Sequence, residues 1–174
     1  DKIAKAGAKR FAIHARKAWL NGLSPKENRT IPPLQYDRIE NLKRQRPELK
    51  IELNGGLMNA NDCLKGLTFC DGVMIGRAAY YHPLRWKNID ELIYGEENKK
   101  ISASSVIKGV IPHAQNHLSK NGKLWDVCRH IVNLVEGIPG ARSWRKEFCL
   151  SAQKKKADVN AMEKAALQLE NAGL

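Results

Sequence analysis

The first half of the chain alternates short apolar runs with stretches in which apolar residues recur every three or four positions. The short runs predict strands at residues 8–14, 49–53 and 69–75, the first of them buried. The recurring positions predict helices at residues 34–46 and 62–66, and either Asn59 or Asn61 can cap the second helix. Because the connections are long enough for parallel pairing, this order of elements predicts an α/β fold with a parallel sheet.

The second half of the chain has helical periodicity throughout. Apolar residues at positions 106, 110 and 111 begin one stripe, in which Pro112 must start or kink a helix. Further apolar faces cover residues 124–134, 141–149 and 161–169, so the pattern predicts a small all-α bundle of four antiparallel helices. A charged run at residues 95–100 separates the two halves and predicts domains at 1–97 and 98–174.

The segment between the predicted sheet and the charged run is rich in aromatic residues. Tyr80, Tyr81, Trp86 and Tyr94 lie within residues 78–94, which we expect to form a last helix and a connector that closes the first domain. Aromatic residues contribute large apolar areas and more often pack in a core than stack on bases. We therefore interpret these four side chains as packing residues.

The charge of the chain is strongly positive, with 30 Lys and Arg residues against 18 Asp and Glu and a formal net charge of +12. Such an excess attracts polyanions, although charge alone does not separate RNA from DNA or from an acidic membrane. We therefore interpret the positive charge first as an indication of a nucleic-acid partner. The 43% of apolar residues suffice for a core, and no apolar run reaches the ~18 residues that span a bilayer. Since no signal-peptide pattern is present either, we expect a cytoplasmic protein.

The cysteine and histidine residues give no disulfide or metal signature. The four cysteines show no CxxC pairing and fall in helix or strand patterns, so we expect reduced and mostly buried thiols. They are Cys63, Cys70, Cys128 and Cys149. His113 and His117 are four residues apart on a predicted helix, a spacing that suits metal ligands, but no third ligand lies nearby. We expect no metal site.

His14 ends the first predicted strand, and a polar, basic loop with Lys26 and Arg29 follows it. In parallel α/β proteins the carboxyl ends of the strands and the loops after them carry the chemistry, so a titratable ring at this place can face a ligand. The alternative is that His14 is a hydrogen-bonded structural residue that merely caps its strand.

Glycines directly follow the next two predicted strands, as Asn54-Gly55-Gly56 and as Gly76-Arg77. Without a Cβ, the backbone can approach a phosphate and turn its N–H groups toward it, and a following helix N-terminus adds partial positive charge. Arg77 can bind the same phosphate through two N–H groups. The alternatives are a tight turn at the first glycine pair and a plain surface arginine at Arg77.

The helical half has nine basic residues against three acidic ones between residues 112 and 156. Arg142 and Arg145 are three residues apart and therefore project from the same face of a helix. Such a pair can bind phosphates and gives salt-sensitive affinity that does not depend on the nucleotide sequence. A solvated helix face is the alternative for any one pair, but the overall bias favours RNA binding.

Four motifs together resemble one known family. They are HARKAWLNGLSPKENR at 14–29, NGG at 54–56, GRAA at 76–79 and GARSWRK at 140–146. Their identity, order and spacing resemble the A subfamily of tRNA-dihydrouridine synthases over nearly the whole chain. The resemblance implies strands six to eight of an FMN-binding (β/α)8 TIM barrel, followed by a helical tRNA-binding domain. It also implies the reduction of tRNA D-loop uridines 20 and 20a to 5,6-dihydrouridine, with NADPH as the reductant.

The resemblance also implies roles for individual residues. FMN would be bound by His14, Asn54, Gly55, Gly56, Gly76 and Arg77. The tRNA would be contacted by Arg29, Pro32, Arg142 and Arg145. The full-length protein is expected to be a monomer that binds neither a metal nor a membrane.

The chain departs from the family pattern at its start. It begins at Asp1, without a methionine and within a predicted helix at residues 1–6, and the family's earlier barrel strands, with the cysteine that protonates the uracil, have no counterpart. We therefore expect a C-terminal fragment, assign no catalytic residue, and expect the isolated chain neither to hold FMN tightly nor to reduce uridine. The alternatives are a stand-alone basic RNA-binding module without catalysis, and another phosphate-binding flavin or sugar-phosphate barrel. The last of these would not explain Arg29, Arg142 and Arg145.

Overall fold

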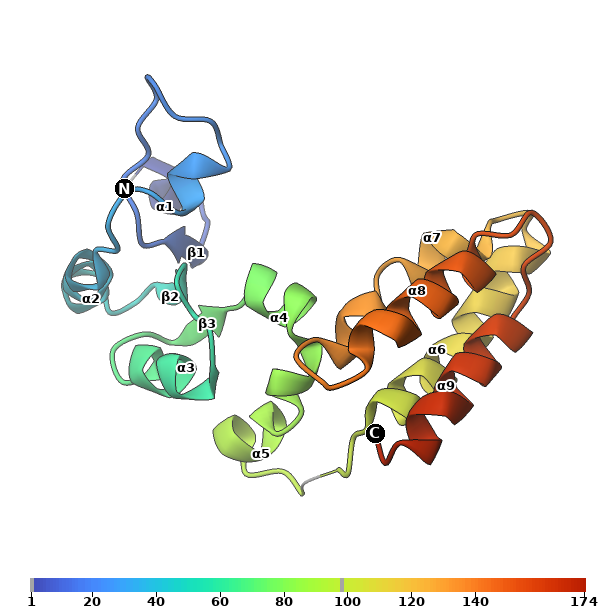
Figure 1. Cartoon of the computed structure of the whole chain (residues 1–174). Helices are drawn as coiled ribbons and strands as arrows, with labels where there is room; N and C mark the ends of the chain where they lie inside the picture. Colours follow the sequence, from blue (N-terminus) through green and yellow to red (C-terminus); the bar gives the residue numbers. More distant parts are fainter. Residues whose placement is uncertain (1, 98) are drawn as a thin grey trace. The chain divides into compact units, whose positions relative to one another are not determined.

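The computed structural model describes residues 2–97 and 99–174. The chain divides into two compact units, Asp1–Ala78 and Ala79–Leu174 (Figure 1), and each is described by itself. α1 (Lys2–Lys5) lies within the helix that was predicted at residues 1–6. Residue 1 lies outside the described residues, as does residue 98 at the predicted domain boundary.

The first unit contains a parallel sheet, which confirms the predicted α/β class. Its strands, in both spatial and sequence order, are β1 (Arg10–His14), β2 (Lys50–Asn54) and β3 (Gly72–Met74). β3 starts later than predicted, because the backbone N–H groups of Phe69 and Cys70 both bond to the carbonyl of Gly66 and so close the preceding helix instead. Parallel pairing brings the carboxyl ends of the strands to one edge of the sheet, with the last residues of β1 and β2 in register.

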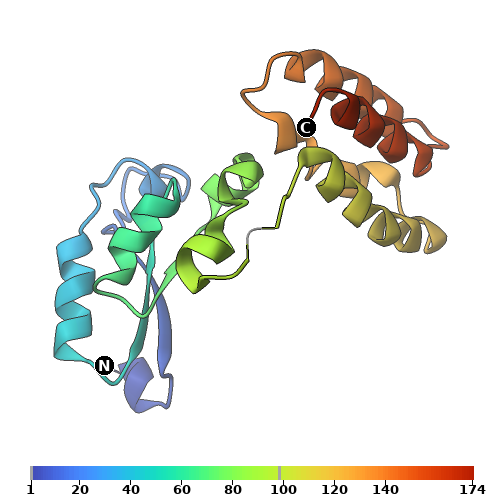
Figure 2. The same cartoon turned by 90° about the horizontal axis from the view of Figure 1, so that it is seen from below.

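Two helices, α2 (Tyr36–Gln45) and α3 (Ala60–Leu67), lie on the same side of the sheet (Figure 2). Leu53 of β2 points toward them and is fully buried. α3 approaches the sheet closely at Gly66, where a Cβ would lie 2.8 Å from the Leu53 side chain. Of the two candidate caps, Asn59 starts this helix, because its side chain accepts a backbone N–H of the first turn at 3.0 Å.

β1 is not buried, contrary to the sequence prediction. Its residues alternate between exposed and half-buried, because no strand of the described chain pairs with its outer edge and the helices of the unit pack over the other two strands. Phe11 and Ile13 instead line an open apolar groove of about 470 Å³, together with Leu42 and Ile51. The apolar side chains that indicated burial therefore face a groove rather than a closed core.

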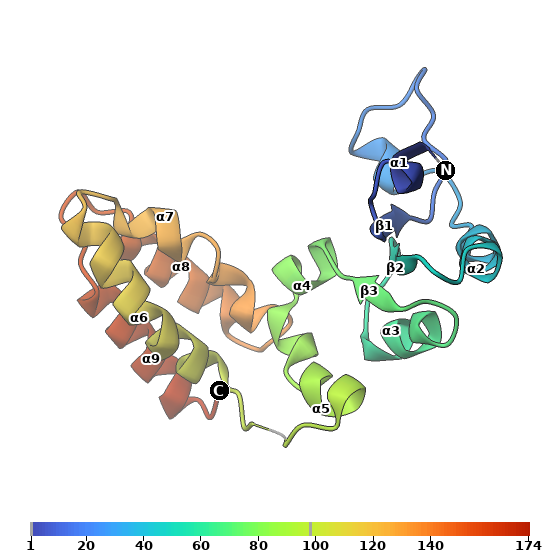
Figure 3. The same cartoon turned by 180° about the vertical axis from the view of Figure 1, so that it is seen from behind.

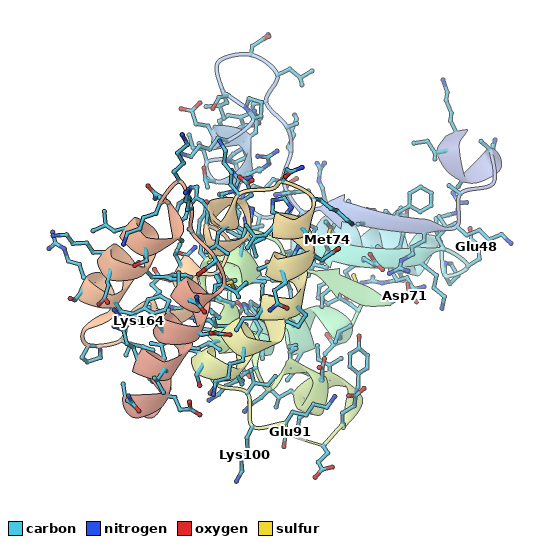
Figure 4. All side chains as sticks on the ribbon, turned by 90° about the vertical axis from the view of Figure 1, so that its right-hand side faces the viewer. Glu48, Asp71, Met74, Glu91, Lys100 and Lys164 are labelled. Atoms are coloured by element: carbon cyan, nitrogen blue, oxygen red, sulfur yellow. The ribbon has the colours of Figure 1, made fainter. Side chains whose placement is uncertain are left out.

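An ion pair fixes the amino-terminal edge of the sheet. The Lys43 ammonium of α2 lies 2.8 Å from the carboxylate of Asp71 (labelled in Figure 4), and this carboxylate also accepts the Ile51 N–H at 2.8 Å. Lys43 donates to the carbonyl of Leu49 as well, at 2.9 Å. The hydrogen bond from Lys43 lowers the pKa of the Asp71 carboxyl, and the pair ties α2 to the starts of β2 and β3.

The second unit is helical. Its elements are α4 (Arg77–Tyr81), which spans the division, the 3₁₀ helix η2 (Pro83–Trp86), α5 (Ile89–Tyr94), α6 (Ala103–Ser119), α7 (Leu124–Cys128), the 3₁₀ helix η3 (Val132–Val135), α8 (Ala141–Ala152) and α9 (Asn160–Asn171). α6 packs against α9, and α8 packs against both α7 and α9 (Figures 1 and 3). Their shared core includes Ile107, Phe148 and Met162, all fully buried. None of the described helices is long and apolar enough to cross a membrane.

Pro112 lies inside α6, so of the two predicted alternatives, a helix start or a kink, the structure excludes the start. α6 begins where the Ser102 hydroxyl accepts a backbone N–H of the first turn at 3.1 Å. Pro112 is exposed, so its ring does not disturb the core and the helix loses only one backbone bond there.

The single apolar face predicted over 124–134 is divided between α7 and η3. The N–H groups of His130 and Ile131 bond three residues back rather than four, which ends α7.

The division between the compact units falls after Ala78, before the predicted domain boundary at 97/98. The reason is that the segment after Ala78 packs on the helical unit. Leu84 lies against its core, and the Tyr80 hydroxyl is 2.9 Å from Nδ1 of His130. The boundary at 97/98 concerns functional domains and in that sense stays a prediction.

The four aromatic residues of this segment do not share one role. Trp86 is buried, as expected. Tyr80, Tyr81 and Tyr94 are 46%, 50% and 74% exposed, so the expectation that all four pack in a core is wrong. About half of the accessible surface of Tyr80 and of Tyr81 is therefore available to a partner.

Candidate functional site

The candidate site lies at the carboxyl edge of the sheet in the first unit. β1 ends at His14 and β2 ends at Asn54, and these two residues are partners in the parallel register. The chain then turns through Gly55, which has a φ of +104°. A Cβ at Gly55 would lie 3.0 Å from Cε1 of the His14 ring, so only glycine lets the loop pass this closely. The structure therefore brings the predicted histidine and glycine positions together.

Tyr36, which no sequence pattern indicated, fixes the glycine loop. Its hydroxyl donates to the carbonyl of Gly55 at 2.7 Å. A Cβ at Gly56, whose φ is +75°, would lie 2.8 Å from the same hydroxyl. On the other side, the Asn54 Nδ2 group donates to the carbonyl of Met74 at 3.3 Å, where β3 ends (Figure 4). The loop is therefore held from two sides.

Arg77 joins the end of the third strand to the basic loop. It follows Gly76 after β3 and is the first residue of α4. Its Nη2 group donates to the backbone carbonyl of Arg29 at 3.0 Å. Both arginine side chains are exposed. The structure thus places a predicted phosphate-binding residue beside a predicted tRNA contact.

The His14 ring is mainly uncharged at neutral pH. Burial lowers its pKa, and the positive charges of Arg16, Arg77 and Arg29 lower it further. A neutral imidazole has one N–H donor and one bare nitrogen, so His14 can both donate and accept a hydrogen bond at this edge. The three arginines make its surroundings positive, which suits an anionic group.

Arg16 is a second site residue that the sequence patterns did not single out. Its Nε and Nη1 atoms are buried and have no hydrogen-bond partner among the described residues. Because a buried N–H group without an acceptor is costly, these atoms are suited to a ligand oxygen. A backbone bridge to Leu34 fixes the position of Arg16. Arg16 could have been proposed from the sequence, because it lies two residues after His14, in the basic loop that follows the first predicted strand.

The basic loop after β1 is held by bonds within itself. The Ser24 hydroxyl lies 2.6 Å from Oε2 of Glu27, and the Glu27 N–H lies 3.3 Å from Oγ of Ser24, where the 3₁₀ helix η1 (Glu27–Arg29) starts. Asn28 spans the loop, since its side chain accepts the Trp19 N–H at 2.7 Å and donates to the Trp19 carbonyl at 2.9 Å. The Ser-Pro-Lys-Glu sequence is a capping-box pattern from which this turn could have been predicted.

Pro32, the other predicted tRNA contact of this loop, is fully buried. Its ring packs inside the unit and offers no surface to a large ligand in this structure. Its predicted role is therefore less well supported than that of the exposed Arg29.

In the second unit, Arg142 and Arg145 lie on one flank of α8. The helix faces the core through Trp144 and Phe148, both of which are buried. Arg142 is exposed, whereas Arg145 is half-buried with its Nε 3.4 Å from the carbonyl of Ala141. The predicted pair therefore lies at the surface and shares one side of its helix.

The four cysteines supply no activated thiol. Burial raises the pKa of Cys70 to about 11 and that of Cys128 to about 12, and it raises the pKa values of Cys63 and Cys149 as well. Three of the thiols are buried, as predicted, and that of Cys149 is half-buried. Protonated thiols are poor nucleophiles. Among the described residues, no group of three His, Cys, Asp or Glu side chains could hold a metal ion.

The sequence is similar to known proteins over almost its whole length. Residues 1–171 match the family model of dihydrouridine synthases. The chain is 42% identical over 165 residues to a tRNA-dihydrouridine(20/20a) synthase of Shewanella oneidensis, with 95% of this chain and 49% of the relative covered. Proteins of the same name from Shigella flexneri and Vibrio cholerae are also 42% identical, with 92% and 95% of this chain and 48% and 50% of the relatives covered. The chain thus spans about half the length of the curated relatives it matches.

Proposed function

The chain belongs to the dihydrouridine synthase family, and on that basis we propose that it forms the part of an FMN-dependent tRNA-dihydrouridine synthase that binds the FMN phosphate and contacts tRNA. The whole protein would be an oxidoreductase that reduces D-loop uridines 20 and 20a to 5,6-dihydrouridine, with NADPH as the electron source. The name of the relatives supports this substrate. The net charge of +12 supports a polyanionic partner.

One observation carries the cofactor proposal, namely that two glycine turns and an arginine meet at the carboxyl edge of a parallel sheet. Gly55 and Gly56 have positive φ values, and a Cβ at either would come too close to a neighbouring side chain. The space that these Cβ atoms would fill is taken by His14, Leu34 and Tyr36, so glycine is needed for the turn itself. The backbone N–H groups of such a turn can donate to phosphate oxygens. Arg77, after Gly76 at the end of the adjacent strand, adds a permanent positive charge. These residues fit the phosphate of FMN.

The remaining residues of this edge suit the rest of the ligand. The phosphate is assigned to Asn54, Gly55, Gly56, Gly76 and Arg77. His14, as a neutral ring beside the glycine loop, would bond to the flavin or to the uracil, and Arg16 would donate its two buried N–H groups to a ligand oxygen. When bound, FMN supplies the redox chemistry, in which electrons from NADPH reach the uracil ring. No residue of this chain is assigned as the catalytic acid.

The wider architecture belongs to the same proposal. β1 to β3 would be strands six to eight of a (β/α)8 TIM barrel, which is supported by the parallel sheet, the helices on one side of it and the edge position of β1. Residues 98–174 would be a helical tRNA-binding domain. The tRNA contacts would be Arg29, Arg142 and Arg145. Pro32 was predicted with them, but it is buried and is not included among the proposed contacts. The protein would act in the cytoplasm as a monomer.

A stand-alone RNA-binding module without catalysis is the second candidate. It is favoured by the exposed basic residues of the second unit. This candidate needs no cofactor, so it predicts that the glycine loop binds no flavin phosphate.

The test compares FMN with riboflavin, which lacks the phosphate. Titrating the 174-residue chain into each flavin and following the flavin fluorescence should give weak binding of FMN and roughly tenfold weaker binding of riboflavin, because a charge-assisted hydrogen bond contributes ~1.5–3 kcal/mol. Arg77→Gln should remove most of this difference. Arg85→Gln, at an exposed arginine of η2, should leave it unchanged. Equal or absent binding of the two flavins by the unaltered chain would contradict the cofactor proposal and favour the RNA-binding module.

A further inference from the structure

Aromatic and basic side chains gather on the second unit, outside the residues assigned above. Tyr80, Tyr81, Arg129 and His130, here called the aromatic cluster, come from α4 and from the residues directly after α7 (Figure 1). The rings of Tyr80 and Tyr81 meet edge to face, with centroids 5.4 Å apart and planes at 81°. Tyr80 and His130 meet in the same way, at 5.9 Å and 71°. The cluster is therefore a built arrangement and not a chance group of surface residues.

The polar edges of the aromatic cluster bond to one another. The Arg129 Nε–H group donates to Nε2 of His130 at 3.2 Å, and since arginine has only donors, this ring nitrogen must be bare. The hydrogen of the neutral imidazole is then on Nδ1 and is donated to the Tyr80 oxygen, 2.9 Å away. These bonds use both ring nitrogens of His130 and the Tyr80 hydroxyl, and the side chains of Tyr80, Tyr81 and Arg129 remain exposed.

A purely structural role does not explain the whole cluster. Tyr80 bonds to His130 and so helps to dock α4 on the helical unit. Tyr81 does not dock α4 in this way. Its ring contact among the described residues is with Tyr80, and about half of the residue is exposed to water. Leaving an aromatic ring half exposed forgoes the free energy of its burial. A half-exposed ring held edge to face by a second ring is instead suited to a partner with a flat face.

An unpaired nucleobase has the chemistry that fits this surface. Every base offers a flat π-face to a tyrosine ring, and an arginine beside the ring attracts the adjoining phosphate. The net charge of +12 favours a polyanion over a neutral or cationic partner. The carboxylate of Glu136 contacts His82, the residue next to Tyr81, and its negative charge opposes an anion at this place.

We infer that the aromatic cluster stacks on an unpaired nucleotide of bound RNA, with Tyr81 as the stacking ring and Tyr80, His130 and Arg129 as its support. The RNA is tRNA on the basis of the proposed function, but the stacking itself needs neither FMN nor catalysis. Because stacking uses the face of a base and not its hydrogen-bond pattern, the cluster accepts any base.

The test uses a fluorescein-labelled single-stranded octauridylate and the full 174-residue chain, with binding followed by fluorescence anisotropy. Tyr81→Leu keeps an apolar side chain but removes the ring, and it should weaken binding about tenfold. Tyr81→Phe keeps the ring and should bind within about twofold of the unaltered chain. Tyr94→Leu is the matched control, because Tyr94 is an exposed tyrosine outside the cluster, at the end of α5. The salt dependence should be the same in all four proteins, since no charge changes. Equal affinities of Tyr81→Leu and the unaltered chain would overturn the inference.

A second measurement needs no variant and so does not depend on how Tyr81→Leu folds. An octanucleotide that contains 5-iodouridine crosslinks under ultraviolet light to aromatic rings that its base contacts, and mass spectrometry locates the crosslink. Crosslinks at Tyr80, Tyr81 or His130 support the inference, and crosslinks confined to other residues, or none, overturn it. Because neither measurement involves a flavin, the inference and the proposed cofactor site succeed or fail separately.

Discussion

At the scale of single residues, the candidate site is a neutral ring among positive charges. Burial and the nearby Arg16, Arg77 and Arg29 lower the pKa of His14. The same arginines attract an anion to this edge of the sheet. A phosphate bound there would offset their charge and would therefore raise the pKa of His14 again.

Arg77→Gln should raise the pKa of His14 toward 6.5 without reaching it, because burial, the largest cause of the shift, remains. NMR titration of the imidazole protons measures this shift, and Arg85→Gln is the control with the same change of charge.

Between the lowered pKa and 6.5, native His14 binds fewer protons than it does in the unfolded chain. The contribution of His14 to stability therefore rises with pH across this window and is lost as the pH falls through it. A His14 pKa at or above 6.5 in the unaltered chain would refute this description.

Some site residues could be predicted from the sequence because strand ends are visible in it. His14 and Arg77 follow apolar runs closely, so their place at the carboxyl edge follows from the pattern alone. Tyr36 and Arg16 could not be found in this way. Tyr36 acts on Gly55, 19 residues further along the chain, and Arg16 is half-buried, with its Nε and Nη1 atoms buried and its backbone bridged to Leu34. Such roles arise from loop packing, which hydrophobic periodicity does not record.

At the scale of elements, the long basic loop before α2 depends on Asn28. Its side chain bonds to both the N–H and the carbonyl of Trp19. Asn28→Ala should therefore speed the hydrogen exchange of the Trp19 amide about tenfold, since losing a bond of this kind costs ~1–2 kcal/mol locally.

Hydrogen exchange followed by NMR measures this effect, and Asn21→Ala, an exposed asparagine of the same loop, is the matched control. Unchanged exchange of the Trp19 amide in Asn28→Ala would show that the loop is held by other contacts.

The elements that the sequence patterns missed have local causes. The apolar face over 124–134 is continuous in sequence. At His130, however, the backbone N–H bonds to the carbonyl three residues earlier instead of four, and no pattern of side chains predicts this change in backbone hydrogen bonding. β1 has the apolar residues of a buried strand, yet burial depends on what covers a strand and not on the strand itself. The order of strands and helices, by contrast, follows directly from the alternation of patterns.

At the scale of the whole molecule, compact units and functional domains need not coincide. The charged run at 95–100 indicated a boundary, but the segment from Tyr80 to Leu84 already packs on the helical unit. Composition marks where a chain is polar, whereas the division of the fold depends on which core each segment joins. The parallel sheet is consistent with membership of the dihydrouridine synthase family, and from that membership we expect the sheet to be part of a larger barrel.

The central claim at this scale is that arginines from both units contact one tRNA. The most direct test is the salt dependence of tRNA binding by the 174-residue chain, measured for two triple variants of equal net charge. One carries Arg29→Gln, Arg142→Gln and Arg145→Gln at the proposed contacts, and the other carries Arg38→Gln, Arg44→Gln and Arg85→Gln at exposed arginines elsewhere.

Each phosphate contact contributes about 0.7–0.9 to the slope of log K against log salt concentration. The first variant should therefore lose roughly two to three units of slope relative to the unaltered chain, and the second should lose little. Equal slopes in the two variants would contradict the claim, because the affinity would then follow net charge and not these three positions.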